Sequence, residues 1–374
     1  MKKNIISYNV DERENKMSLV NKKPLMTIIV PAYNVEKYLE QCLDSLVYQT
    51  IMDHRIIVVN DGSTDNTAEI IKKYINEYPE LISWIDQENK GLGAARNRGL
   101  RLVETPFVTC IDSDDWQDQM FVERIKNVVN KYDEQPDIIF TLPWLYDSVT
   151  HQVTEWYDKD TFEKIFFPNS EKEDKMSIVT NARENKFLYE LEASTNRRIY
   201  RTEFLHKIGF SYTEGKKWED VKPHFHAIHH ADRCIALKNT GFFYRVNTGG
   251  QITSGGGKSR LDIIPVFRDT LDMAFTEGWN EIEIAYILRM LWNFTTWSID
   301  VTNTEYIGSL LKNLHELFNS IPYKNFKIYF KTCSPHRRKE MVKTWLLKSP
   351  FYNILKDYRV REYGVRIIRK LKRR

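Results

Sequence analysis

Short apolar runs alternate with helix-like segments through the first third of the chain. Five such runs predict strands: Met26–Val30, Arg55–Val59, Leu81–Ile85, Phe107–Ile111 and Ile138–Leu142. Between them lie segments such as Val35–Val47 and Asn66–Tyr78, in which apolar residues recur three and four positions apart, as on one face of a helix. This alternation predicts an α/β fold, in which a parallel sheet is flanked by helices.

Beyond residue 142 the pattern becomes irregular and then helical. Shorter segments of both kinds continue to residue 246, and a glycine-rich loop, Asn247–Lys258, follows. Farther on, apolar residues take the spacing of one helix face: Ile284, Ile287, Leu288, Leu291 and Trp292. We therefore expect three parts: a polar N-terminal extension at residues 1–24, an α/β domain at 25–258, and a helical C-terminal module at 259–374.

Polar turns follow four of the predicted strands. They are Pro31-Ala32-Tyr33-Asn34, Asn60-Asp61-Gly62-Ser63, Asn89-Lys90-Gly91 and Asp112-Ser113-Asp114. In open α/β sheets, ligands bind outside the carboxyl ends of the strands. Four polar turns at that one edge therefore predict a binding site there.

The last of these turns carries two aspartates, Asp112 and Asp114, two positions apart. Side chains two apart on an extended chain point the same way, so both carboxylates can aim an oxygen at one hard divalent cation. Mg²⁺ or Mn²⁺ held by one or two carboxylates keeps coordination positions for substrate phosphates and water. Asp and Ser are also common turn formers, so an acidic turn with solvated carboxylates stays an open alternative.

Composition limits the class of protein. Of the 374 residues, 42% are hydrophobic and 28% charged, as in an ordinary globular chain, and the net charge of +4 gives no reason to expect nucleic-acid binding. The four cysteines form no C-x-x-C pair, and neither a signal-peptide core nor an apolar run of about 18 residues occurs. We therefore expect a cytoplasmic protein without a membrane span.

The positive charge gathers in the C-terminal tail. Nine Lys and Arg residues lie between Lys356 and Arg374, with apolar residues such as Tyr363 and Ile367 among them. A basic helix of this composition can lie on an anionic membrane surface, which would place the protein at the inner face of the membrane. A solubilising terminus has the same composition, and both interpretations stay open.

Four motifs together resemble, in order and spacing, the family-2 inverting glycosyltransferases of the GT-A fold over about residues 26–254. The motifs are Val30-Pro31-Ala32-Tyr33-Asn34; Asn60-Asp61-Gly62-Ser63-Thr64-Asp65; Asn89-Lys90-Gly91 with Ala94-Ala95-Arg96-Asn97; and Asp112-Ser113-Asp114-Asp115. Four motifs in register make the resemblance specific, although each alone would be weak. It implies a Rossmann-like, mostly parallel sheet flanked by helices.

The resemblance also implies roles for the matching residues in binding a UDP-sugar. The nucleobase and ribose pocket would be lined by Pro31, Ala32, Tyr33 and Glu36, while Asp61 would accept from the uracil edge. Tyr33 offers a face on which a base can stack. The ribose and phosphates would be bordered by Asn89, Gly91 and Arg96. Asp112 and Asp114 would hold Mn²⁺ or Mg²⁺ on the diphosphate, and Ser113 would face the sugar.

Two further residues receive catalytic roles from the resemblance. Trp218-Glu219-Asp220 resembles the family's acidic pair at the start of a helix, and Asp220 is the expected general base; a plain helix N-terminus would favour the same acidic residues. Arg245 matches the family's basic residue near a mobile loop that closes over the pyrophosphate. Lys258, at the end of the glycine-rich loop, is a second candidate for that role.

Two other groups of basic residues are candidates for acceptor or metal binding. The segment Ser194–Arg201 resembles the stretch that helps to form the acceptor site, where Arg197 or Arg198 could meet an anionic acceptor or belong to a solvated face. His226 and His230 have the i, i+4 spacing of metal ligands. No H-E-x-x-H pattern accompanies them, so we expect ordinary surface histidines.

Two glycine motifs fit other classes of protein poorly. Gly91-Leu92-Gly93-Ala94-Ala95-Arg96 resembles a dinucleotide fingerprint, but Arg96 replaces the third glycine, which close packing of helix on strand requires. Gly255-Gly256-Gly257-Lys258-Ser259 resembles a P-loop, but Ile252 stands in the place of its first glycine. We therefore expect neither a dehydrogenase nor a P-loop enzyme.

The resemblance predicts a metal-dependent hexosyl- or N-acetylhexosaminyl-transferase. Its acceptor would be a cell-surface glycan, a lipid-linked intermediate or a polyol phosphate, as in the synthesis of bacterial capsule, cell wall or teichoic acid. A nucleotide-sugar-binding scaffold without turnover and a nucleotidyltransferase remain as alternatives. The sequence predicts no oligomeric state.

Overall fold

The computed structural model of the protein describes residues 23–168, 177–248 and 255–333. The expected N-terminal extension up to residue 22, part of the glycine-rich loop and the basic tail lie outside these residues. The chain forms two compact units, residues 1–251 and 252–374. The boundary between them thus lies seven residues before the predicted end of the α/β domain at residue 258.

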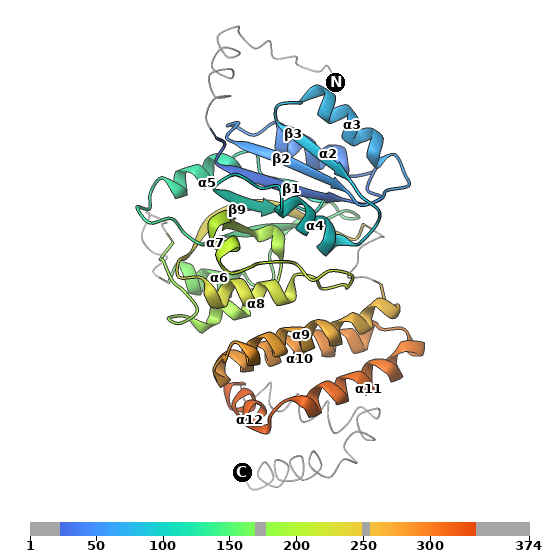
Figure 1. The fold of residues 1–374 in the computed structure, drawn as a ribbon, viewed down its shortest axis with the longest axis vertical. Helices are drawn as coiled ribbons and strands as arrows, with labels where there is room; N and C mark the ends of the chain where they lie inside the picture. The colour runs from blue at the N-terminus through green and yellow to red at the C-terminus, as the bar shows by residue number, and fades with distance from the viewer. Residues whose placement is uncertain (1–22, 169–176, 249–254, 334–374) are drawn as a thin grey trace. The chain divides into compact units, whose positions relative to one another are not determined.

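The five predicted strands are all present. They are β1 (Met26–Ala32), β2 (His54–Asn60), β3 (Ile82–Asp86), β4 (Phe107–Cys110) and β6 (Ile138–Asp147). β1 pairs in parallel with β2 and β4, and β2 pairs in parallel with β3 (Figure 1). Every residue of β1 is buried, because helices cover a parallel sheet on both faces.

The other half of the sheet is mixed. β8 (Arg198–Arg201) lies antiparallel between β4 and β6, and β9 (Cys234–Val246) pairs in parallel with β6. Two short strands, β5 (Trp116–Gln117) and β7 (Val153–Glu155), add antiparallel to β9 and β6. Because two successive antiparallel pairings restore the direction, β6 and β9 run the same way as β1. The longer strands therefore share one direction, and the expected GT-A architecture is confirmed with a mixed rather than a purely parallel sheet.

Helices follow the strands and cover the sheet. In the first unit they are α2 (Leu39–Val47), α3 (Thr67–Glu77), α4 (Leu92–Leu100), α5 (Phe121–Val129), α6 (Lys159–Phe166), α7 (Thr202–Lys207) and α8 (Val221–His230), with the 3-10 turns η2 (Lys186–Glu190) and η3 (Thr195–Arg197). α4 packs on β1 and β2. A Cβ at Gly99 would lie 2.5 Å from the Ile29 side chain, so this glycine lets α4 approach the sheet closely.

The second unit is helical, as predicted. Its elements are η5 (Lys258–Asp262), α9 (Ile263–Thr276), α10 (Glu281–Val301), α11 (Thr304–Ser320) and α12 (Tyr323–Thr332). α10 begins at a capping box between Asn280 and Glu283, and it packs against α9 and α12. Its predicted apolar face is buried. Among the described residues, no helix has the length and apolar character needed to cross a membrane.

Candidate active site at the carboxyl ends of the strands

The polar turns after β1 and β2 are tied together. Asn34 adopts a left-handed backbone (φ 48°); its side-chain oxygen accepts from Thr64 N at 2.7 Å, and its own N–H donates to Ser63 Oγ at 3.1 Å. Glu36 accepts from the backbone and side-chain nitrogens of Asn66 at 2.9 and 2.8 Å. Near them, Pro31 and Ala32 end β1, and Tyr33 is 50% exposed, so its ring is open to a ligand.

Asp61 ties the second turn to the third. Its carboxylate is buried and accepts from Gln87 Nε2 (2.7 Å), Lys90 N (2.9 Å) and Gly91 N (2.8 Å). A carboxylate has about four acceptor positions. Asp61 therefore holds the turn that carries Asn89 and Gly91 and has acceptor capacity left for a further donor.

Arg96 joins the third turn to the acidic turn and to the start of α8. Arg96 lies on α4. Its guanidinium is almost fully buried and forms ion pairs with Asp112 (2.5 Å) and with Glu219. An arginine fork can bind two carboxylates at fixed geometry, and a buried charge needs such partners. The residue that breaks the dinucleotide fingerprint thus links the expected metal ligand to the expected catalytic pair.

The four acidic-turn residues differ in their surroundings. Ser113 and Asp115 are buried, and Asp115 accepts from Arg245 N (2.8 Å) and Asn196 Nδ2 (3.1 Å). Burial, together with the neighbouring Asp112, raises the pKa of Asp114 to about 6. Its carboxylate accepts from its own backbone N–H and bonds to no other residue in the part of the chain that the structure describes.

These carboxylates fit a divalent cation. Asp112 gives one oxygen to Arg96 and keeps the other, while the Asp114 carboxylate bonds only its own backbone N–H. Two neighbouring carboxylates with spare acceptor positions are the hard donor set that Mg²⁺ and Mn²⁺ prefer. Burial and then repulsion by Asp112 raise the pKa of Asp114, and a bound cation would offset both.

Arg245 lies on β9 beneath the acidic turn. Its Nε donates to Asp114 O at 2.7 Å and its Nη2 to Gln41 Oε1 at 2.6 Å. Three aromatic rings surround the guanidinium, with centroids 4.7 to 5.4 Å away: Tyr38, Trp116 and Tyr146. The second expected lid cation, Lys258, belongs to the other unit.

Glu219 and Asp220 precede α8, as predicted, with Asp220 in the N-cap position. The residue before them, Trp218, has φ 64°, a strained value for a side chain of that size. Glu219 is paired with Arg96, but the Asp220 carboxylate bonds its own backbone N–H and no other described residue. Burial and the adjacent Glu219 raise the pKa of Asp220 well above its ordinary value, against the charges of Arg96 and Arg198.

The expectation that Arg197 or Arg198 presents its charge to solvent or to an acceptor is wrong. Both side chains are fully buried. Arg197 pairs with Asp158 at 2.6 Å, and Arg198 donates to Glu192 O (2.7 Å) and His224 Nδ1 (2.5 Å). Arg197 ends η3 and Arg198 begins β8, and the packing of both elements against the sheet buries the charges that the sequence suggested would be exposed.

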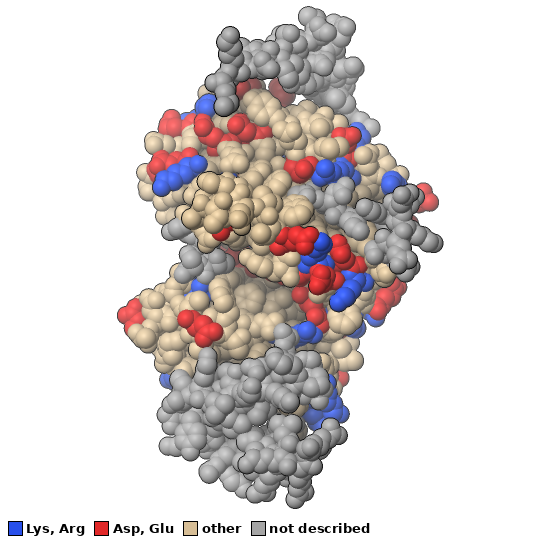
Figure 2. Space-filling view, turned by 180° about the vertical axis from the view of Figure 1, so that it is seen from behind, with Lys and Arg blue, Asp and Glu red and all other residues tan. Residues whose placement is uncertain are grey.

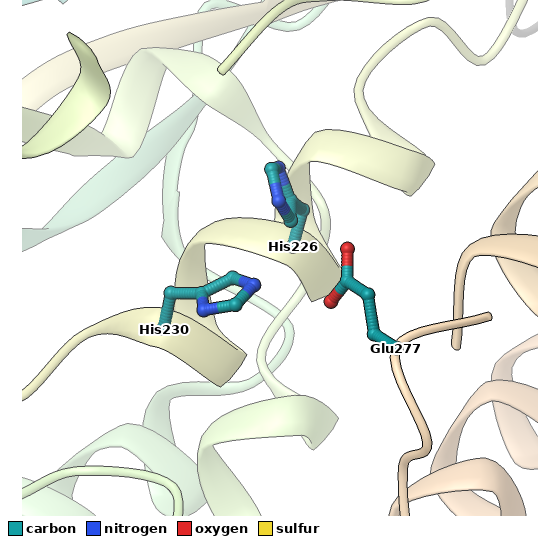
Figure 3. Close-up of side chains that lie close together, drawn as sticks. All are labelled: His226, His230 and Glu277. Carbon is teal, nitrogen blue, oxygen red and sulfur yellow. The ribbon is translucent and has the colours of Figure 1, made fainter. Parts of the chain in front are cut away.

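Of the four histidines of α8, His224 is buried, whereas His226, His229 and His230 are at least partly exposed. The His226 and His230 rings lie 4.9 Å apart on successive turns (Figure 3). The third residue drawn there, Glu277, belongs to the other unit.

Sequence reasoning missed the residues that hold Arg245. Tyr38 and Gln41 come from the α2 region, Trp116 from β5 and Tyr146 from β6, so no local motif contains them. The sequence contained only an indirect indication of these contacts with Arg245, because aromatic residues recur near each of these strand ends.

Comparison with known proteins agrees with this geometry. The family model described as glycosyl transferase family 2 matches residues 27–193. Glycosyltransferase GlyA of Streptococcus pneumoniae is 34% identical over 230 residues, which cover 60% of this chain and 31% of GlyA. A teichoic acid poly(glycerol phosphate) polymerase of Staphylococcus epidermidis is 28% identical over 225 residues, 59% of this chain and 28% of the polymerase. The chain thus spans about a third or less of these relatives.

A solved structure shares the fold across nearly the whole chain. The crystal structure of S. aureus TarS 1–349 in complex with UDP superimposes with a TM-score of 0.65 at 20% identity and covers 89% of this chain and 91% of TarS 1–349. The family model, the motifs in register and the shared architecture agree. Residues 27–193 therefore match the model of glycosyl transferase family 2, and the chain shares the fold of TarS.

Proposed function

We propose that the chain transfers a hexosyl or N-acetylhexosaminyl group from a UDP-sugar to a hydroxyl group of a cell-surface glycan, lipid-linked or polyol-phosphate acceptor, with inversion. The observation that carries this proposal is the Asp220 carboxylate, which bonds no other described residue and follows directly after Glu219, whose ion pair with Arg96 connects it to Asp112. A proton acceptor and a diphosphate-binding turn are thereby held in one frame.

Asp220 acts as the general base. In an inverting transfer the acceptor oxygen attacks the anomeric carbon from the side opposite the departing diphosphate, so one carboxylate within reach of that hydroxyl is enough. Burial and Glu219 raise the pKa of Asp220, which makes it a stronger proton acceptor than a solvated aspartate. The bond from the anomeric carbon to the diphosphate breaks as the new glycosidic bond forms, and the proton passes to Asp220.

Asp112 and Asp114 hold the divalent cation, Mn²⁺ or Mg²⁺. When bound, the cation supplies positive charge that stabilises the diphosphate leaving group. Arg96 and Arg245 keep the two aspartates in place through the Asp112 ion pair and the Asp114 carbonyl. The exposed ring of Tyr33 receives the base, and Asp61 keeps acceptor capacity for the uracil edge.

The relatives support the donor and the setting. TarS was crystallised with UDP, and the polymerase relative makes teichoic acid, a cell-surface polymer. On the face drawn in Figure 2, acidic and basic side chains of the described residues are interspersed. Such a mixed surface is consistent with a small-molecule donor, because a nucleic acid would call for a continuous basic stripe.

The proposal is tested by incubating the protein with UDP-, GDP- and CDP-sugars, with and without Mn²⁺, and measuring free nucleoside diphosphate. We expect UDP release that requires the cation and rises with an acceptor, together with an inverted anomeric configuration in the product by NMR. Release of sugar 1-phosphate instead, with transfer of the nucleoside monophosphate group, would identify a nucleotidyltransferase. Binding of UDP-sugar without turnover under any acceptor would identify a scaffold.

A further inference from the structure

Trp156, Tyr157 and Tyr244 form an aromatic cluster. Trp156 is buried, and its ring contacts those of Tyr157 and Tyr244 with centroids 5.3 and 5.4 Å apart. Tyr157 is 72% exposed, although a ring of that size normally buries most of its surface. The cluster thus presents an accessible aromatic face on a buried support.

Glu192 borders this cluster. Its backbone is held on both sides, because its N–H donates to Asp158 Oδ2 at 2.9 Å and its carbonyl accepts from Arg198 at 2.7 Å. The side chain keeps an exposed face, yet protein atoms crowd the carboxyl group and raise its pKa to about 7. Because Asp158, which accepts the Glu192 N–H, follows Tyr157 directly in the chain, Glu192 lies beside the segment that carries the Tyr157 ring.

The cluster adjoins both halves of the proposed chemistry. Tyr244 directly precedes Arg245, whose N–H donates to Asp115 of the acidic turn. On the other side, Arg198 donates to Glu192 O and contacts His224 Nδ1, and the His224 N–H donates to Asp220 O at the start of α8. A sugar ring resting between Tyr157 and Glu192 would therefore lie beside the general base.

The charges available to a ligand here are negative. Arg197 and Arg198 are fully buried, Arg197 is paired with Asp158, and Arg198 donates to Glu192 O and His224. Glu192 is an exposed residue, and Asp114 is partly exposed. A phosphate group needs accessible cationic or backbone donors and would meet like charge at this position.

We propose that Tyr157, Glu192 and Tyr244 form the acceptor subsite and that they select an uncharged sugar ring rather than a polyol phosphate. This inference rests on the proposed function, whose acceptor class it specifies. The C–H bonds on the apolar face of a sugar ring lie against the negative face of Tyr157, and the ring hydroxyl groups donate to Glu192. Tyr244 orients the reacting hydroxyl group between the acidic turn and Asp220.

Binding is tested first, because it does not depend on turnover. Saturation-transfer NMR with full-length protein and UDP is recorded with lactose, cellobiose and chitobiose, and with glycerol 3-phosphate and ribitol 5-phosphate. We expect transfer to at least one disaccharide, and loss of that transfer in Tyr157→Ala and Glu192→Gln. Transfer to the polyol phosphates alone, or disaccharide binding unchanged in both variants, would overturn the proposal.

Kinetics then separate this subsite from the donor site. With the disaccharide that binds, both variants should raise the acceptor KM at least about fivefold, equivalent to about 1 kcal/mol, and leave the KM for the UDP-sugar and acceptor-independent UDP release unchanged. The matched controls are Tyr48→Ala and Glu134→Gln, two exposed residues elsewhere on the surface. Wild-type protein that never releases UDP would contradict the proposed function, whereas an unchanged acceptor KM in active variants would contradict the subsite alone.

Discussion

Arg96 and Asp112 form an ion pair in which the guanidinium is 3% and the carboxylate 27% exposed, with 2.5 Å between Nη2 and Oδ1. The same guanidinium also binds Glu219, which comes directly before Asp220. One buried cation thus fixes the separation between the proposed cation-binding turn and the proposed base. Neither carboxylate can move without leaving a charge unpaired in the interior.

Replacing Arg96 should therefore damage both stability and activity. Arg96→Met leaves Glu219 and Asp112 without a counter-charge, and removal of one partner from a buried pair costs about 3–5 kcal/mol. Urea denaturation measures this loss. Arg96→Lys keeps the charge but lacks the forked guanidinium group, so its free energy of unfolding should lie between those of the wild type and Arg96→Met. A stable Arg96→Met protein with wild-type turnover would show that the ion pairs are dispensable.

Asp220→Asn should lower kcat by at least about 100-fold, because a general base typically contributes 10² to 10⁴. The amide has the same shape and can still accept from the Asp220 backbone N–H, and the carboxylate bonds no other described residue, so folding and UDP binding should stay unchanged. Calorimetric titration with UDP checks the second expectation. Lost donor affinity in this variant would contradict the assignment of the base.

Asp114→Asn should abolish the stimulation of UDP release by Mn²⁺. The free energy of unfolding should stay the same or increase, because burial and Asp112 already disfavour the charged form of this side chain. The matched control is Asp133→Asn, which removes an exposed aspartate. Equal Mn²⁺ titration curves for wild type and Asp114→Asn would exclude this residue as a ligand.

Arg245→Lys tests whether this residue holds the acidic turn. Lysine keeps the charge inside the aromatic cage but cannot donate at once to Asp114 O and Gln41, so at least one charge-assisted bond is lost. Such a bond contributes about 1.5–3 kcal/mol, and we expect the half-saturating Mn²⁺ concentration to rise about tenfold or more. Gln41→Leu should shift the same titration in the same direction. An unchanged titration in both variants would argue against this positioning role.

Local motifs carried most of what the sequence could predict. The strands that end at Ala32, Asn60 and Cys110 have apolar runs long enough to identify, and Asp112, Asp114 and Asp220 lie in short motifs. The acidic pair at the start of α8 was placed correctly for the same reason.

Long-range pairing could not be predicted in this way. Arg96 and Glu219 are 123 positions apart, and Arg245 and Gln41 are 204 apart, so no window of sequence contains both partners. The insertion of β8 between β4 and β6 buries Arg198, whose charge alone had suggested the surface. Tertiary packing decided each of these positions, and single-sequence patterns do not record it.

A buried histidine should make the α/β unit sensitive to acid. His54 begins β2 and is 1% exposed, and its Nε2–H donates to Leu46 O at 2.9 Å. Burial lowers its pKa from 6.5 to about 4. Between these values the unfolded chain binds a proton that the folded chain does not, so unfolding becomes more favourable as the pH falls from 6.5 towards 4. The contribution of His54 is about 2 kcal/mol lost between pH 7 and pH 5.

His54→Gln separates this effect from the other titrating groups. The glutamine amide can still donate to Leu46 O but does not titrate, so the variant should lose less of its free energy of unfolding than wild type between pH 7 and pH 5. Urea denaturation at both values gives the difference, and His206→Gln, an exposed histidine, is the control. If wild type and His54→Gln lose equal stability, then His54 must take up its proton in the folded chain at an ordinary pH, and the buried site must open to water before the unit unfolds.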